Sequence, residues 1–250
     1  SLALGVEYEP ISGHKFHASV GRAFRLPSVN ELTSNGVHHG AFRHEKGDSS
    51  LVSEQGWQAD LSYSLSQGRW EVTISPFYSY YPHFIALHPT GRWSMLPDAG
   101  QVYQYADAPT TLAGGELVVK ARVWRALHYT LSGEYVYTYD HHSHTATPYS
   151  PPANMHNTLS WEASRWRCYA ECQSVAAQHR VCHNEMETNG YNIFNIGGSV
   201  DIALQERKLS LMLNIRNLFD TSYLNHLSFY RRIELPEAGA DIQTTIRLNY

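Results

Sequence analysis

The chain has 250 residues, a formal net charge of −4 and no cluster of basic residues, which argues against nucleic acid as a partner. Its mean hydropathy is negative, and no run of about eighteen apolar residues occurs, so a transmembrane helix is excluded. Seventeen Tyr and six Trp are more than a soluble core needs, and these residues gather at both rims of an outer-membrane β-barrel.

Alternation of apolar and polar residues predicts strands along most of the chain. In one of them Trp57 and Leu61 share a face and polar residues occupy the other. In the last run Ile242 and Ile246 share a face with Tyr250, which we expect to end the strand facing lipid. We predict eleven strands, at 1–10, 14–25, 54–66, 69–87, 101–123, 126–140, 154–164, 166–178, 190–204, 207–218 and 239–250.

The connections between these strands alternate strictly between short and long. The short ones lie near 11–13, 67–68, 124–125, 165 and 205–206, and the long ones at 26–53, 88–100, 141–153, 179–189 and 219–238. Outer-membrane barrels have short periplasmic turns and long extracellular loops. A soluble β-sandwich, the alternative that alternation leaves open, has no reason for this asymmetry. We therefore predict an all-β fold, an antiparallel transmembrane β-barrel with the long connections on one extracellular rim.

Eleven strands do not close such a barrel. A single-chain bacterial barrel is expected to have an even number of strands. An open sheet in lipid would leave backbone groups without partners along both edges. We therefore expect the rest of the barrel to lie on another polypeptide or in a longer parent chain.

The segment 21–32 resembles a family signature at the top of an ascending strand. Phe24, Arg25 and Pro27 are similar to the first part of FRxP-x-x-NEL, and residues 30–32 to its last part. Leu26 stands where Ala is commoner in the family, a mild change that leaves the segment recognisable.

A second segment, 214–223, resembles the penultimate-strand signature N-x-x-NLFD-x-x-Y. Asn217, Leu218, Phe219 and Asp220 match its central tetrad, and residues 235–239 resemble the P-x-x-G stretch before the last strand. Together the two segments resemble the TonB-dependent outer-membrane receptors, and the resemblance covers essentially the whole chain.

The resemblance implies a 22-stranded barrel in the bacterial outer membrane, an N-terminal plug inside it and a short box that engages a TonB-type energising complex. Residues 1–250 would be the C-terminal portion of that barrel, in contact with outer-membrane lipid. Neither the plug nor the TonB-engaging box is visible here, so transport would need the missing N-terminal part. A surface-binding barrel that does not transport is the alternative, and a plug in the parent chain would distinguish the two.

Histidine is the candidate ligand type, because ten of the fifteen histidines fall in the long connections. Imidazole binds transition metals and haem iron, so we expect a metal-containing cargo, which would be haem, a ferric siderophore or Zn, and no permanently bound cofactor. The alternative is that these are solvated loop residues. The candidate cargo-binding residues are His38, His39, His44, His141, His142 and His144.

His38 and His39 come first because they follow the FRxP-like segment directly. In haem receptors of the resembled family, a histidine in this connection faces the substrate cavity. The NPNL box that such receptors carry would fall near 47–51, where only the final Leu matches. The resemblance therefore favours a metal ion or a siderophore over haem.

Enzymatic chemistry and a disulfide framework have little support. No G-x-S-x-G, P-loop, dinucleotide-binding or H-E-x-x-H motif occurs, although a barrel-borne lipase would escape this test. Cys172 and Cys182 are spaced so that a bridge is conceivable, but free thiols are the simpler expectation for three cysteines.

Overall fold

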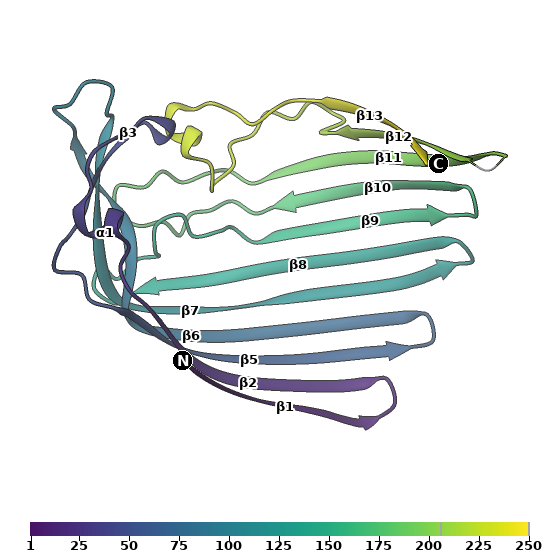
Figure 1. Ribbon diagram of the computed structural model, residues 1–250, viewed down its shortest axis with the longest axis horizontal. Helices are drawn as coiled ribbons and strands as arrows, with labels where there is room; N and C mark the ends of the chain where they lie inside the picture. Colours follow the sequence, from purple (N-terminus) through teal and green to yellow (C-terminus); the bar gives the residue numbers. More distant parts are fainter. Residues whose placement is uncertain (206, 250) are drawn as a thin grey trace.

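The computed structural model describes residues 1–205 and 207–249. In this part of the chain eleven antiparallel strands run side by side in one curved sheet, and β3 and β4 lie off that path (Figure 1). The wall strands are β1 (Leu2–Ile11), β2 (His14–Arg25), β5 (Glu54–Gln67), β6 (Trp70–Trp93), β7 (Gln101–Trp124), β8 (Leu127–Asp140), β9 (Asn154–Glu162), β10 (Trp166–Val175), β11 (Tyr191–Leu204), β12 (Arg207–Arg216) and β13 (Asp241–Asn249).

The sheet is open within the described residues, because β1 and β13 are its edges and do not pair with each other. The all-β fold and the eleven predicted wall strands are confirmed, most bounds within about three residues. One prediction was wrong: β6 continues to Trp93 instead of ending near 87, so the connection predicted at 88–100 shrinks to 94–100. The predicted lipid-facing position of Tyr250 lies outside the described residues.

The connection at 26–53 holds structure that alternation did not predict. It contains α1 (Val29–Thr33), β3 (Asn35–His38), η1 (His39–Ala41) and β4 (Arg43–Lys46). β3 pairs with β4, and β4 adds in parallel to the upper part of β7. These four-residue strands are too short to show a period of two in the sequence. A further helix, η2 (Phe229–Ile233), lies before β13.

The outer face of the wall is apolar and carries two aromatic rows. In the upper row Arg22, Trp57, Tyr80 and Tyr139 lie in register across β2, β5, β6 and β8, with a threonine of β7 between the two tyrosines. The lower row starts with Trp70 on β6 and continues with Tyr129, Trp161 and Trp166, on β8, β9 and β10, near the short turns.

The spacing of the two rows matches a membrane. Ten residues separate Tyr80 from Trp70 on β6, and ten separate Tyr139 from Tyr129 on β8. At about 3.3 Å per residue this is roughly 33 Å along a strand. A tilt of about 40° reduces it to roughly 25 Å in height, which is the height of the apolar band of an outer-membrane barrel. Exposed side chains such as Ile242 (68%) and Ile246 (69%) belong to this outer face.

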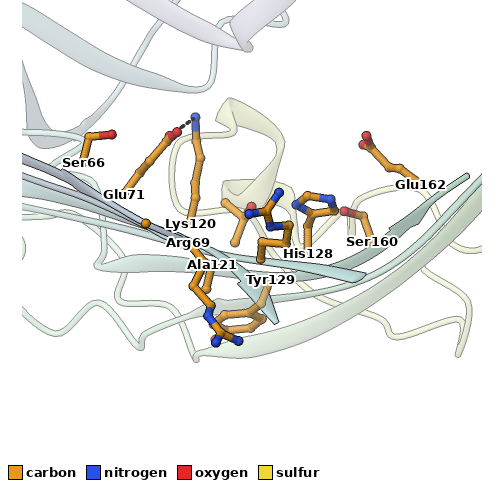
Figure 2. Close-up of a pocket in the computed structure, with 12 residues that line it drawn as sticks. Ser66, Arg69, Glu71, Lys120, Ala121, His128, Tyr129, Ser160 and Glu162 are labelled. Atoms are coloured by element: carbon orange, nitrogen blue, oxygen red, sulfur yellow. Dashed lines mark ion pairs between the residues drawn. The ribbon is translucent and has the colours of Figure 1, made fainter. Parts of the chain in front are cut away.

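The inner face of the wall is polar, and neighbouring strands are linked across it. Ser62 and Ser75 hydroxyls lie 3.0 Å apart, and Asn195 donates to Glu171 at 2.8 Å. Near the short turns the same face has a hollow of about 390 Å³, lined among others by Glu71 and Lys120, which form an ion pair at 3.8 Å (Figure 2). A face of this kind suits a wet lumen.

The two ends of the wall differ, as the connection lengths predict. Tight turns at 12–13, 68–69, 125–126 and 163–165 lie at one end, and the long connections gather at the other, with the C-terminal end of the chain on the tight-turn side (Figure 1). Within the described residues no helix is long and apolar enough to cross a membrane.

Candidate functional site

The FRxP-like segment shapes the turn by which the chain leaves the top of β2. Ser28 caps α1: its hydroxyl accepts from the Glu31 amide at 3.3 Å, and the Glu31 carboxylate accepts from the Ser28 amide at 2.6 Å. Arg25 donates to Glu31 at 2.9 Å and to Glu54 at 3.0 Å. Burial raises the pKa of Glu31, but its bonds to Arg25 and to the Ser28 amide leave that pKa below its ordinary value. Arg25 thus ties α1 to the start of β5.

Two residues of this segment have no polar role. Phe24 is an exposed residue of β2, and Pro27 precedes the cap of α1, where its missing N–H costs nothing. The matched residues Phe24, Arg25 and Pro27 therefore lie at a strand end, and Phe24 lines a hollow there together with Leu2 and Gln55.

The first three candidate histidines lie on the β3–β4 hairpin but in different environments. His38 ends β3 and His39 begins η1, and both side chains are exposed. His44 on β4 is buried, with Nδ1 2.9 Å from the Ser94 hydroxyl and Nε2 3.0 Å from the Asn35 side-chain oxygen. Because both its ring nitrogens have partners, His44 holds the hairpin in place, while His38 and His39 remain accessible.

The hairpin meets a loop from the far end of the sheet. The Arg43 guanidinium lies 5.2 Å from the ring centroid of Tyr103 on β7 and 4.4 Å from that of Phe229 on η2. Phe42 packs edge-on against Tyr230, with ring centroids 6.2 Å apart. The segment after β2 and the segment before β13 therefore touch above the rim, although their strands lie near opposite edges of the sheet.

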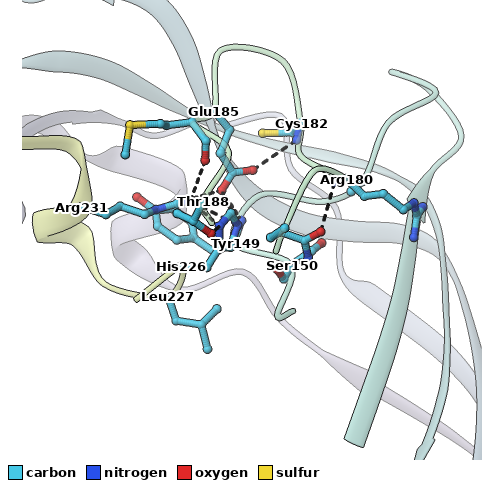
Figure 3. Close-up of polar contacts among 12 residues, drawn as sticks. Tyr149, Ser150, Arg180, Cys182, Glu185, Thr188, His226, Leu227 and Arg231 are labelled. Carbon is cyan, nitrogen blue, oxygen red and sulfur yellow. Dashed lines mark hydrogen bonds and ion pairs between the residues drawn. The ribbon is translucent and has the colours of Figure 1, made fainter. Parts of the chain in front are cut away.

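Three buried polar side chains, Glu185, His226 and Arg231, form what we call the rim network (Figure 3). Arg231 donates to Glu185 at 2.5 Å. The same carboxylate oxygen accepts from the Tyr149 amide at 2.8 Å, and His226 Nδ1 lies 2.9 Å from the Thr188 hydroxyl. Three long connections are joined in this way.

The electrostatics of the rim network favour a charged Glu185 and a neutral His226. Burial raises the pKa of Glu185, but the Tyr149 amide, Arg231 and the Cys182 amide outweigh it and hold that pKa below its ordinary value. Burial and the neighbouring Arg231 lower the pKa of His226 to about 4. Arg231 Nε is buried without a hydrogen-bond partner among the described atoms, which is costly for a charged group.

The remaining candidate histidines, His141, His142 and His144, follow β8 and are exposed. The His141 ring lies edge-on to Tyr139, with centroids 4.9 Å apart, and His144 Nδ1 is 3.1 Å from the Tyr139 hydroxyl. Tyr139 belongs to the upper aromatic row of the outer face. The structure therefore places His141 and His144 against the outside of the wall.

The second matched segment fixes the exit from β12. Asn217 is buried with φ 48°, and its side chain accepts from the Thr221 amide at 2.8 Å. The Asp220 carboxylate accepts from the Ala240 amide at 2.9 Å, just before β13. Phe219 packs against Phe194, with ring centroids 5.1 Å apart.

Leu218 completes this tetrad through its backbone, since its amide donates to the Phe194 carbonyl at 2.7 Å. All four matched residues, Asn217 to Asp220, thus set the geometry of the loop before the last strand.

Comparison with known families identifies this geometry. Residues 1–218 match the family model described as "TonB dependent receptor-like, beta-barrel". The chain belongs to the TonB-dependent receptor β-barrel family. Barrels of this family are outer-membrane proteins, so the wall is a membrane wall and its long connections form the extracellular rim.

Solved structures share the fold of this receptor chain. The "Copper transporter OprC" is 19% identical with a TM-score of 0.84, and the match covers 98% of this chain and 38% of that one. The ferric enterobactin receptor PfeA from Pseudomonas aeruginosa is 17% identical with a TM-score of 0.71, and the match covers 98% of this chain and 40% of that one.

The FrpB iron transporter from Neisseria meningitidis is 16% identical with a TM-score of 0.71, and the match covers 98% of this chain and 38% of that one. The receptor chain thus spans about two-fifths of the length of these structures. No curated protein sequence matches it.

A preformed metal centre does not occur in the described part of the receptor, where no three or more His, Cys, Asp or Glu side chains are arranged to hold an ion. Cys168, Cys172 and Cys182 are free thiols. The rim network was not predicted from the sequence. The one signal in the sequence is the pair of neighbouring arginines, Arg231 and Arg232, within a long connection. The sequence alone does not indicate which carboxylate pairs with them.

Proposed function

We propose that this chain is the C-terminal part of a TonB-dependent transporter that takes up a metal-containing cargo through the outer membrane. The observation that carries the proposal is the meeting of Phe42 and Tyr230 above the rim, because it brings loops from both edges of the sheet over one opening. The plug and the contact with a TonB-type energising complex would come from the N-terminal part of the protein.

His38 and His39 are the proposed cargo contacts. Both are exposed, and they lie on the hairpin that meets η2, whereas His44 has both ring nitrogens engaged. Two exposed imidazoles on a short hairpin are too few to hold a metal ion alone. They suit a cargo whose metal already has other ligands, or a metal ion that residues of other loops bind as well.

The cargo class is a metal ion, a ferric siderophore or haem. The relatives are described as transporters or receptors for copper, ferric enterobactin and iron. Copper is the cargo named for one of these structures, and zinc, like copper, binds imidazole, so both ions are included among the cargoes to test. Metal binding through imidazole should weaken in acid, because protons compete for the same nitrogen.

The test is binding by the full-length receptor in detergent. Copper, zinc, a ferric siderophore and haem are titrated into wild type and the His38→Ala/His39→Ala variant. We expect about a tenfold loss of affinity for one of these cargoes, as is usual when groups that support a metal site are removed. Uptake by whole cells that express the variant should fall in parallel.

The matched control is His141→Ala/His144→Ala, which removes two exposed histidines from the outside of the wall. It should leave cargo affinity unchanged. Equal affinity of wild type and the His38→Ala/His39→Ala variant for all four cargoes would refute the histidine contacts. Binding without uptake by the wild-type receptor would instead favour a surface-binding barrel.

A further inference from the structure

A group of side chains on the outside of the wall has no part in the proposed transport site. It consists of Tyr137, Tyr139, His141, His144 and Arg180, and we call it the outer-rim cluster. The Arg180 guanidinium lies 3.9 Å from the ring centroid of Tyr137. Tyr137 stacks with Tyr139 at 6.5 Å between centroids, and both histidines contact Tyr139.

The outer-rim cluster lies at the height where the apolar band ends. Tyr139 is in register, through β7, with Tyr80 and Trp57, which form the upper aromatic row. Aromatic rows of outer-membrane barrels mark the level of the lipid headgroups. His141 and His144 follow Tyr139 in the chain and therefore extend the cluster into the headgroup layer.

The polar groups of the cluster are one guanidinium and two imidazoles, and none of them has a carboxylate partner among the described residues. Arg180 is exposed and gives one N–H to the Thr138 carbonyl at 3.1 Å, and it has no ion pair among the described residues. His141 and His144 each have a hydrogen bond at one ring nitrogen only within the same residues. Asp140, which lies between Tyr139 and His141 in the chain, is buried and accepts from the His142 amide at 2.8 Å.

We propose that the outer-rim cluster binds the phosphate of an anionic lipid headgroup in the outer leaflet, one that carries no cation of its own to balance the phosphate. Arginine presents a planar set of donors that matches phosphate, and each imidazole beside it has one ring nitrogen without a partner among the described residues. Lipid is the source of this phosphate because the cluster is on the outer face, directly above the apolar band. An arginine also lies over an aromatic ring at the other end of the upper aromatic row, where the Arg22 guanidinium is 5.7 Å from the Trp57 ring centroid.

The test uses the full-length receptor in bilayer nanodiscs of phosphatidylcholine with a minor share of phosphatidylglycerol. The lipid retained after extraction into detergent is counted by native mass spectrometry. We expect wild type to retain phosphatidylglycerol in preference to phosphatidylcholine. Arg180→Glu should reduce that preference about fivefold or more, which corresponds to one cation near an anionic surface.

A second variant guards against misfolding, since Arg180 also holds the Thr138 carbonyl. Arg180→Gln/His141→Gln/His144→Gln keeps hydrogen-bonding groups of similar size and should lose the preference as well. His38→Ala/His39→Ala should keep it. The proposal is overturned if the charge-removing variants retain as much phosphatidylglycerol as wild type, or if inorganic phosphate alone displaces the lipid.

Discussion

The membrane wall and the extracellular rim of this receptor are stabilised in different ways. In the wall, each strand pairs with the next wall strand along the chain, and the polar inner face and apolar outer face repeat with a period of two. At the rim, buried polar side chains join residues that are far apart, such as Glu185 with Arg231 and Gln101 with Arg232. We therefore expect the wall to tolerate substitution of single residues, and the rim to depend on a few charged ones.

Removing the cation of the rim network should have the largest effect. Arg231→Ala leaves the buried Glu185 carboxylate without its charge partner, and breaking a buried ion pair in this way costs about 3–5 kcal/mol. The amides of Tyr149 and Cys182, which donate to Glu185, should lose protection from hydrogen exchange. Arg92→Ala, at an exposed arginine, should leave them protected, and wall amides should be unchanged in both variants.

Acidification should open the same network. The pKa of His226 is about 4 in the closed rim against 6.5 in an open one. The open state therefore takes up a proton that the closed state refuses, so stability is intact above pH 6.5 and falls as the pH drops toward 4. The loss reaches about 3 kcal/mol. The lowered pKa of Glu185 adds to the loss at still lower pH.

A nitroxide at the exposed Leu227 position would report this opening as increased mobility between pH 7.5 and 4. His226→Gln should remove the part of the response that lies above pH 4.5. A label whose mobility does not change with pH in wild type would show that the network does not hold the loops.

A smaller effect is expected from substituting a glycine in segment 26–53, and two glycines there can be compared. A Cβ at Gly47 would lie 2.6 Å from the backbone of Leu32 and Thr33, whereas a Cβ at Gly36 has nothing within 4 Å. Gly47→Ala should therefore displace the hairpin that carries His38, at a cost of about 1–3 kcal/mol. Limited proteolysis of segment 26–53 should speed up in Gly47→Ala and not in Gly36→Ala, and equal rates would contradict the close packing.

The smallest effect should come from Arg25→Lys. The charge is kept, but one ammonium cannot reproduce the two bonds to Glu31 and Glu54. Because the Arg25 side chain is 42% exposed, the loss should stay below about 1 kcal/mol. It should appear as faster exchange of the Leu32 amide, which bonds to Ser28 within α1. A change as large as that of Arg231→Ala would mean that the FRxP-like segment also stabilises the rim network.

The wall of the barrel could be predicted from the sequence, whereas the contacts of the rim could not. Alternation and loop lengths predicted the strands and the rim, because a wall residue such as Trp57 is specified by its neighbours two positions away. The ion pair of Glu185 and Arg231 leaves no local pattern, since it joins separate loops. The histidines show the limit best: His38 and His44 look alike in sequence, yet only the latter has both ring nitrogens engaged.

The most direct test of the account asks whether loops from both edges of the sheet meet over the opening. In the full-length receptor without its native cysteines, Phe42→Cys and Tyr230→Cys are combined, and intact cells are treated with a short bis-methanethiosulfonate linker that does not cross membranes. Each cysteine then forms a disulfide with the linker and releases methanesulfinate. We expect rapid cross-linking, since the two rings are 6.2 Å apart, and a loss of metal uptake that reduction restores. Cross-linking only after the outer membrane is broken, or none at all, would contradict it.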